Sequence, residues 1–352
     1  PPAQSDERAA RGEPFTIRFR VPEGETAWDD VVHGETRFQN ESLEDFIVLR
    51  TDGTPIYNMA VVSDDIDMRI THVIRGDDHI SNTPKQILLY QALGAQVPIF
   101  AHLPMILGED GRKLSKRRNA VAVGDYAAEG ILPGALVNFL ALLGWNPGDE
   151  QEVFTLDELV QAFTLDRINK KSAVFDTTKL AWMNGQHMAR TDAAHLLPLV
   201  APLLVYEGMI AEEEVATRRE WLLWLVDLLR VRARTVPEIV EQARVFFAPP
   251  AEYDPAAVAK QWKDRAGVDR ALGAVADVLA ALEPWEPAAI EAALRAAAEA
   301  AGLGFGKVAQ PLRIALTGSL ASPGIDQVVA LLGRAETLDR IATARRWVEQ
   351  AV

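Results

Sequence analysis

The sequence contains no cysteine. This absence excludes a disulfide framework and any thiolate metal site, and it leaves no need for an oxidising compartment. His187 and His195 also lack partners at the spacing of metal ligands, so we expect no zinc site and no other resident metal. A reducing cytoplasm is the expected location.

Long apolar segments are absent as well. No run approaches the ~20 residues that a membrane span needs, and residues 1 to 11 are polar and lack the apolar centre of a signal peptide. We expect neither membrane insertion nor secretion.

An excess of positive charge is the third missing feature. The formal net charge is −14, whereas proteins that coat nucleic acid non-specifically neutralise phosphates with a basic excess. Contact with nucleic acid must therefore be local. One basic cluster could supply such a local contact, and it consists of Arg112, Lys113, Lys116, Arg117 and Arg118.

The first part of the chain has mixed α and β signals. With 352 residues, of which 49% are hydrophobic, the chain is long enough for two or three domains. Short β segments are predicted between Phe15 and Leu49. Ile56 to Ser63 and Ile70 to Ile74 are apolar, β-branched runs of strand length, and a helix follows with Thr83 as its N-cap and Pro84 at its first position. The order strand, loop, helix indicates an α/β region.

The rest of the chain is predicted to be helical. Residues 135 to 143 and 156 to 163 have the pattern of buried helices, and from about Asp192 onward helical periodicity continues with almost no β signal. The fold class is therefore α/β followed by all-α. One apolar helix face is interpreted as core rather than as a cofactor site: Trp221, Leu222, Leu225, Leu228 and Leu229.

The most informative chemistry is in Lys113-Leu114-Ser115-Lys116-Arg117, which follows a glycine-bounded turn at 108 to 111. Two ammonium groups on a loop can close over a triphosphate and neutralise the charge that develops as pyrophosphate leaves. A solvated basic loop explains the same run if it stands alone, so its context decides.

That context includes Arg75, Asp77, Asp78 and His79, which follow a predicted parallel strand. In open α/β sheets ligands bind at the carboxyl ends of the strands. The planar fork of Arg75 suits a carboxylate, and an acidic side chain there can accept hydrogen bonds from ribose hydroxyls. A structural Arg–Asp pair that caps the loop is the alternative.

Several segments together resemble one family, the bacterial glutamyl-tRNA synthetases. Those with the family's order and spacing are Arg50 to Tyr57, Ile70 to Gln86, Leu103 to Arg117 and Leu136 to Trp145. Lys113 to Arg117 is similar to the family's KMSKS signature. Ser172 to Gly185 resembles its stem-contacting region, and Val308 to Gly318 resembles its second anticodon-binding subdomain.

The resemblance implies a ligase that activates glutamate. The glutamate carboxylate attacks the α-phosphate of ATP, and the resulting glutamyl-adenylate passes its acyl group to the 3′ end of a glutamate-accepting tRNA. By this resemblance Tyr57 and Arg75 bind glutamate, with Arg75 on the α-carboxylate. Such chemistry needs positioning and charge stabilisation rather than a protein nucleophile.

The resemblance also implies a nucleotide site. Asp78 and the backbone near Ile106 would contact ATP, which is used with Mg²⁺ as a substrate. Lys116 would bind the phosphates with help from Lys113, so these two lysines are the expected catalytic residues.

The chain departs from the family pattern in one important respect. Class I synthetases carry a HIGH-type signature, and the six histidines here form no His-x-Gly-His group: His33, His72, His79, His102, His187 and His195. We therefore expect that the chain begins inside the acceptor-binding insertion, lacks the half that holds adenine and the glutamate side chain, and is inactive alone. Two smaller departures are Arg118-Asn119 in place of His-Gly, and Asp77 where Glu is usual.

This interpretation assigns four regions. Residues 1–50 would be the remainder of the acceptor-binding insertion, and 51–118 the second half of a Rossmann-like catalytic domain with its KMSKS-type loop. Residues 119–190 would be a helical stem-contact region, and 191–352 an all-α anticodon-binding domain. The expected partners are tRNA, glutamate and ATP, with no membrane, and the expected state is a monomer.

Three alternatives remain open. A non-catalytic tRNA-binding protein could be built from the same modules. A glutaminyl relative is disfavoured because its anticodon region is a β-barrel, a pattern that does not appear after residue 192. A tRNA-modifying, glutamyl-transferring paralogue is disfavoured because such proteins lack an anticodon domain.

Overall fold

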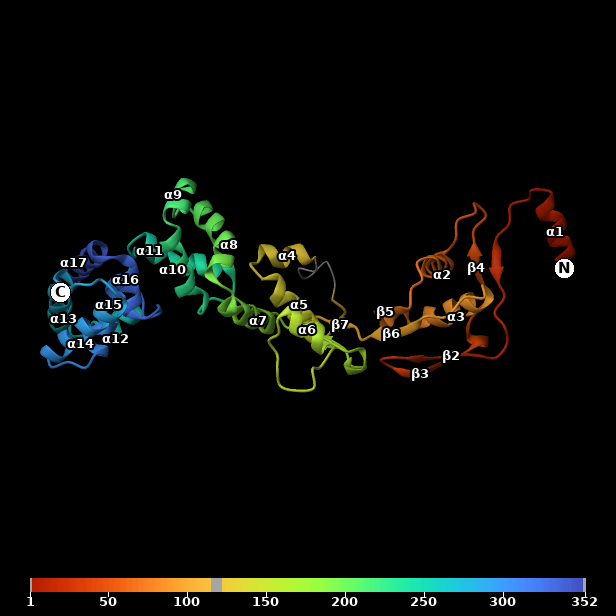
Figure 1. The fold of residues 1–352 in the computed structure, drawn as a ribbon, viewed down its shortest axis with the longest axis horizontal. Helices are drawn as coiled ribbons and strands as arrows, with labels where there is room; N and C mark the ends of the chain where they lie inside the picture. The colour runs from red at the N-terminus through yellow and green to blue at the C-terminus, as the bar shows by residue number, and fades with distance from the viewer. Residues whose placement is uncertain (1, 115–121, 351–352) are drawn as a thin grey trace. The chain divides into compact units, whose positions relative to one another are not determined.

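The computed structural model describes residues 2–114 and 122–350, which form two compact units (Figure 1). Unit 1 comprises Pro1–Ala122 and Leu136–Thr177, and unit 2 comprises Val123–Ala135 and Thr178–Val352. Within the described residues, no helix combines the length and the apolar character that crossing a bilayer requires.

Unit 1 opens with helix α1 (Pro2–Ala10) and two antiparallel strand pairs. β1 (Ile17–Phe19) pairs with β4 (Phe46–Leu49), and β2 (Glu25–Asp30) forms a hairpin with β3 (Gly34–Gln39), after which comes the short helix η1 (Asn40–Ser42). The predicted β segments between Phe15 and Leu49 are therefore confirmed.

The next element is a helix, where the sequence suggested a strand. Residues Tyr57–Asp67 form α2. Met59, Val62 and Ile66 recur at helical spacing and face one core, in which Val62 is fully buried. The prediction of a strand from Ile56 to Ser63 rests on apolar composition alone, and a short apolar run does not distinguish a strand from a buried helix. The strand prediction for this segment is wrong.

A parallel β-α-β unit follows. β5 (His72–Gly76) leads through the 3₁₀ helix η2 (Asp77–Asn82) and helix α3 (Thr83–Ala92) to β6 (Ile99–Leu103). The two strands pair in parallel from His72 opposite Ile99 to Gly76 opposite Leu103 (Figure 1). Helix α3 begins at Thr83 with Pro84 in its first turn, one residue earlier than predicted. Strand, loop and helix are confirmed in this order.

The core of this region joins helix and strand. Val62 of α2, Ile87, Leu89 and Tyr90 of α3 and Phe100 of β6 form one buried apolar cluster. The β2–β3 hairpin lies against β6, because the N–H of Val31 donates to the carbonyl of Phe100 at 2.9 Å. This packing fixes β2 beside the sheet and thereby places its last residue, Asp30, near the strand ends.

Unit 1 ends with short elements around a second buried cluster. β7 (Ile106–Leu107) pairs in parallel with β8 (Ala173–Val174). Helix α5 (Pro133–Leu142) contributes its later residues to unit 1, and α6 (Leu156–Ala162) and the 3₁₀ helix η3 (Leu165–Arg167) follow. Both predicted helices exist. However, Leu156 is 62% exposed and Val160 is 72% exposed, so α6 buries only one face.

The described part of unit 2 is entirely helical, as predicted. Its helices are α4 (Val123–Ala128), α7 (Thr177–Arg190), α8 (Ala193–Tyr206), α9 (Glu212–Thr217), α10 (Arg219–Arg230), α11 (Val236–Phe247), α12 (Pro255–Gln261), α13 (Arg265–Ala280), α14 (Pro287–Ala300), α15 (Gly306–Thr317), α16 (Ile325–Leu332) and α17 (Arg334–Gln350). In α10 the side chains of Leu222, Leu225 and Leu229 are fully buried, which confirms that its apolar face is core.

Candidate active site

The candidate site lies at the carboxyl end of β5. Arg75 is the penultimate residue of the strand, and η2 carries Asp78 and His79 directly after it. Because β5 and β6 are parallel and in register, Arg75 lies opposite His102. The structure thus places Arg75 and Asp78 at the sheet edge where α/β proteins bind ligands.

One edge of the Arg75 guanidinium is held by the protein. Nε donates to Nε2 of His102 at 3.2 Å, and Nη2 donates to Oγ1 of Thr83 at 2.7 Å. The Phe100 ring lies 5.5 Å from Cζ and covers one face of the group. Burial lowers the pKa of Arg75, yet a guanidinium retains its charge at neutral pH.

The alternative of an Arg–Asp pair that caps the loop does not describe Arg75. Its side chain donates to His102 and Thr83, while the carboxylate of Asp78 is bound by Lys113. Arg75 is therefore a partly buried cation with two neutral partners, an arrangement that suits an incoming carboxylate.

Tyr57 is near the same strand end. It is the first residue of α2, and its ring centroid lies 6.3 Å from that of His79. Its side chain is 52% exposed. Tyr57 thus lies beside His79, in the segment that directly follows the strand carrying Arg75, although 18 positions of sequence separate Tyr57 from Arg75.

Lys113 joins this site through Asp78. Its Nζ lies 3.0 Å from Oδ2 of Asp78, and this hydrogen bond lowers the pKa of the Asp78 carboxyl. Both side chains are largely exposed, so the pair adds little stability. Its importance is positional, because it brings the first residue of the KMSKS-like segment to the strand end that carries Arg75.

The backbone around Ile106 explains why Lys113 reaches that place. The chain folds back over the turn at Gly108–Gly111, where Gly108 N–H donates to the Arg112 carbonyl at 2.8 Å. The carbonyl of Ile106 then accepts from the N–H of Leu114 at 3.3 Å. The predicted turn is confirmed, and the segment that enters the KMSKS-like loop is fixed to β7.

The rest of that loop lies outside the described residues. Ser115, Lys116 and Arg117 belong to it, as do Arg118 and Asn119. The expected phosphate contact of Lys116 therefore stays a prediction, whereas Lys113 and Leu114 are placed.

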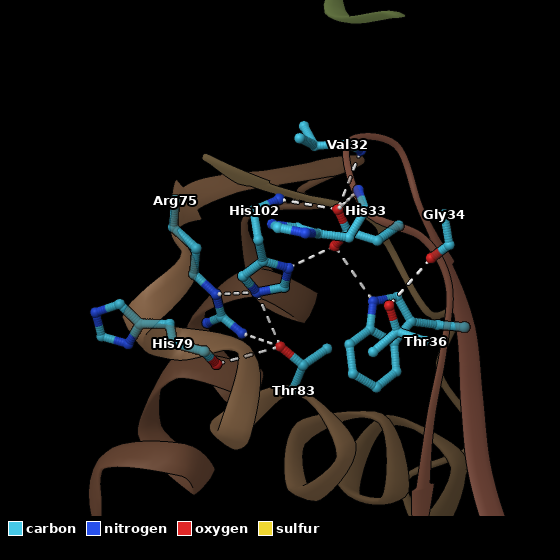
Figure 2. Close-up of polar contacts among 10 residues, drawn as sticks. Val32, His33, Gly34, Thr36, Arg75, His79, Thr83 and His102 are labelled. Carbon is cyan, nitrogen blue, oxygen red and sulfur yellow. Dashed lines mark hydrogen bonds and ion pairs between the residues drawn. The ribbon is translucent and has the colours of Figure 1, made fainter. Parts of the chain in front are cut away.

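Sequence reasoning missed a buried polar network behind Arg75 (Figure 2). Asp30 is 2% exposed, and His102 and Thr83 are fully buried. Nδ1 of His102 lies 2.5 Å from Oδ2 of Asp30, and its Nε2 lies 3.0 Å from Oγ1 of Thr83. Asp30 and His102 are 72 positions apart. The only local signal was a histidine inside an apolar strand, and that alone does not identify its partner.

Hydrogen bonding and burial set the charges in this network. Burial alone would raise the pKa of Asp30, but donation from the His102 ring and from the backbone N–H groups of His33 and His102 outweighs it, so the pKa lies below its ordinary value. Burial lowers the pKa of His102 despite the neighbouring carboxylate. The resulting state has an ionised Asp30, a neutral His102 and a charged Arg75.

Three cationic residues of the later helices of unit 2 differ in their surroundings. Arg313 is partly buried and donates to the Ser322 carbonyl at 3.0 Å, so it fixes the loop after α15. Arg346 donates to Thr343 within its own helix at 3.0 Å. Lys307 is exposed at the start of α15.

Within the segment 172–185, Asn184 has a structural role. It is fully buried, its Oδ1 accepts from the N–H of Leu132 at 2.8 Å, and its Nδ2 donates to the carbonyls of Gly130 and Arg234 at 3.1 and 2.6 Å. It therefore ties α7 to two loops of unit 2.

Among all the described residues, no group of three or more His, Cys, Asp or Glu side chains is gathered in a way that could hold a metal ion.

Comparison with known proteins agrees with this geometry. Residues 2–182 match the family model of tRNA synthetases class I (E and Q), catalytic domain, and residues 193–345 match that of an anticodon binding domain. The chain is 47% identical over 346 residues to glutamate–tRNA ligase 1 of Alkalilimnicola ehrlichii, covering 96% of this chain and 70% of the relative. It is 45% identical over 329 residues to glutamate–tRNA ligase of Thermodesulfovibrio yellowstonii, covering 93% and 70%.

A solved structure is similar as well. The crystal structure of a glutamate tRNA ligase from Elizabethkingia meningosepticum in complex with its amino acid has a TM-score of 0.84 and 30% sequence identity. The match covers 98% of this chain and 71% of that chain. Two family models in the correct order, relatives at this identity and a site with the expected residues all agree. The chain belongs to the glutamyl-tRNA synthetase family of class I aminoacyl-tRNA synthetases.

Proposed function

We propose that this chain supplies the carboxylate-binding, nucleotide-binding and tRNA-binding residues of a glutamate–tRNA ligase. The observation that carries the proposal is the ion pair of Lys113 with Asp78 at 3.0 Å, at the strand end where Arg75 lies. This pair puts a cation of the KMSKS-like segment, an acceptor for ribose and an anchor for a carboxylate into one site.

In the proposed reaction, Arg75 and Tyr57 hold glutamate with its α-carboxylate oriented toward ATP. That carboxylate attacks the α-phosphate, the bond to pyrophosphate breaks, and glutamyl-adenylate forms. The tRNA ribose hydroxyl then displaces AMP from the acyl carbon. Asp78 contacts the nucleotide, and Lys113 with Lys116 neutralises the charge that develops on the leaving pyrophosphate.

The helical part of the chain supports the tRNA-binding half of the proposal, because residues 193–345 match an anticodon binding domain. We assign residues 1–50, 51–118, 119–190 and 191–352 to the acceptor-binding insertion, the catalytic domain with its KMSKS-type loop, the stem-contact region and the anticodon-binding domain. The proposed protein acts as a cytoplasmic monomer and uses ATP with Mg²⁺.

A chimera tests the proposal directly. The chain covers 70% of the Alkalilimnicola ehrlichii ligase, so it can replace the matching part of that relative, which then supplies the remainder. We expect the chimera to charge tRNA with glutamate, measured with radiolabelled amino acid. A chimera that binds tRNA yet fails to form glutamyl-adenylate would instead support the non-catalytic alternative.

Matched variants of the chimera test the glutamate role of Arg75. Arg75→Ala should raise the KM for glutamate far more than the KM for ATP, because it removes a charge-assisted contact to a carboxylate. Arg69→Ala removes an exposed arginine before the opposite end of β5 and serves as the control. An unchanged glutamate KM in Arg75→Ala would contradict the assignment.

A further inference from the structure

We infer that Asp30 and His102 are positioning residues that hold the Arg75 guanidinium in the orientation in which it binds the glutamate carboxylate. This role rests on the proposed function. Neither residue touches the ligand side of Arg75. His102 comes from β6, which pairs with β5, and Asp30 comes from β2, which packs against β6.

The partners of Asp30 establish its charge. Its carboxylate receives hydrogen bonds from the backbone N–H groups of Val32, His33 and His102 at 3.1, 3.1 and 3.2 Å, and from the Trp28 indole at 3.3 Å (Figure 2). All of these groups are donors. A carboxylate surrounded by donors is stabilised in its ionised form, so the fifth contact, to Nδ1 of His102, must also be a donation.

The tautomer of His102 follows from this. With the proton on Nδ1, Nε2 carries a lone pair and accepts from Nε of Arg75 at 3.2 Å. Arginine has no acceptor, so a protonated Nε2 would face a donor at that distance. The carboxylate of Asp30 thus determines, through the imidazole, that Arg75 meets an acceptor.

The way in which Arg75 is held leaves one edge for a ligand. Nε and Nη2 form the side-on edge of the guanidinium, and both are used by His102 and Thr83. Nη1 forms no hydrogen bond to any residue in the described part of the chain. The end-on edge of Nη1 and Nη2 therefore remains for two parallel bonds to a carboxylate, the geometry that arginine prefers.

Fixing the guanidinium in advance matters because arginine has many rotamers. An unanchored arginine side chain must be ordered each time glutamate binds, and this entropic cost weakens binding. A mobile guanidinium would also hold the glutamate carboxylate less accurately in the position for attack on the α-phosphate. A purely structural network would stabilise unit 1 without any selective effect on glutamate. The two roles are therefore distinguishable by kinetics.

The first test uses the unaltered chain labelled with ¹⁵N in its histidines. Long-range ¹H–¹⁵N correlation spectra at pH 7.5 should show His102 as a neutral ring with its proton on Nδ1. A proton on Nε2, or a doubly protonated ring, would overturn the inference. This measurement needs neither a variant nor catalytic activity.

The second test compares two amides at position 102 in the chimera. His102→Gln can place an acceptor where Nε2 lies, whereas His102→Asn keeps a donor for Asp30 but has no atom near Nε2. We expect His102→Asn to raise the KM for glutamate about ten-fold, the effect of one lost hydrogen bond to a charged group, with little change in the KM for ATP. The KM for glutamate of His102→Gln should be close to that of the wild type.

Controls separate the possible failures. His72→Asn alters an exposed histidine at the other end of β5 and should leave both KM values unchanged. In the background of Arg75→Lys, which lacks Nε, His102→Asn should have no further effect on glutamate. A chimera that never uses glutamate refutes the proposed function and this role with it. A glutamate KM equal in wild type and His102→Asn, in an active chimera, refutes the positioning role alone.

Discussion

The neutral state of His102 predicts how the stability of unit 1 depends on pH. Burial lowers the pKa of His102 in the folded protein, while in the unfolded chain a histidine titrates near pH 6.5. Below that pH the unfolded state binds a proton that the folded state does not. The contribution of the neutral His102 to the free energy of unfolding is therefore fully present above about pH 6.5, and it is lost as the pH falls toward the pKa of His102 in the folded protein.

The expected loss follows from linkage. Lowering the pH from 7.5 to 5.5 converts an unfolded histidine from about 10% to about 90% protonated, which lowers the free energy of unfolding by about 1.4 kcal/mol if His102 remains neutral. The groups that face His102 are Asp30 of β2, Arg75 of β5 and His33 in the β2–β3 turn. The lowered pKa of Asp30 places its titration below this pH range.

Hydrogen exchange of the β5 and β6 amides measures this quantity for unit 1 separately from unit 2. The free energy of exchange, corrected for intrinsic rates, should fall between pH 7.5 and pH 5.5. We expect this fall to be larger in the wild type than in His102→Gln by about 1.4 kcal/mol, because glutamine has no proton to bind. Other titrating groups cancel in this comparison. Equal losses in both proteins would show that His102 is not held neutral.

Three further changes test other parts of the structure. Asn184→Leu removes the acceptor of the buried Leu132 N–H and one donor each from the partly buried carbonyls of Gly130 and Arg234. Denaturant titration should show a loss of about 1–3 kcal/mol in the free energy of unfolding, and no loss would contradict the role of Asn184 in tying α7 to the two loops. Gly318→Ala puts a Cβ 2.8 Å from Cβ of Pro250 at a φ of +79°, and thermal unfolding should show a loss of at least about 1–2 kcal/mol in stability. Gly302→Ala is the control, because its φ is +65° but its Cβ would meet open space; its loss should be smaller, and equal losses would contradict the clash at Gly318. Lys116→Ala in the chimera should slow pyrophosphate exchange about 10²-fold while tRNA affinity, measured by filter binding, is retained; equal loss of both would contradict its role on the phosphates.

Much of the site was predictable because its signals are local. The turn residues Gly108 and Gly111, Lys113 after them, and the strand β5 with Arg75 near its end and Asp78 directly after it all lie within short windows of sequence. Helical periodicity after Asp192 was equally local and predicted the all-α half correctly. The order and spacing of the segments then indicated the family, which the comparisons confirmed.

What the sequence determined by itself is therefore the set of elements with clear periodicity or turn chemistry, and the chemical character of the strand end. Tertiary structure alone decided two things. Residues Tyr57–Asp67 form a helix because a helix places Met59, Val62 and Ile66 on one face, where they pack in the core formed with α3 and β6. Tertiary structure also brought Asp30 to His102 across 72 positions, and His102 to Arg75 across 27. Strand pairing and hairpin docking create such contacts, and no local pattern encodes which buried carboxylate will meet which imidazole.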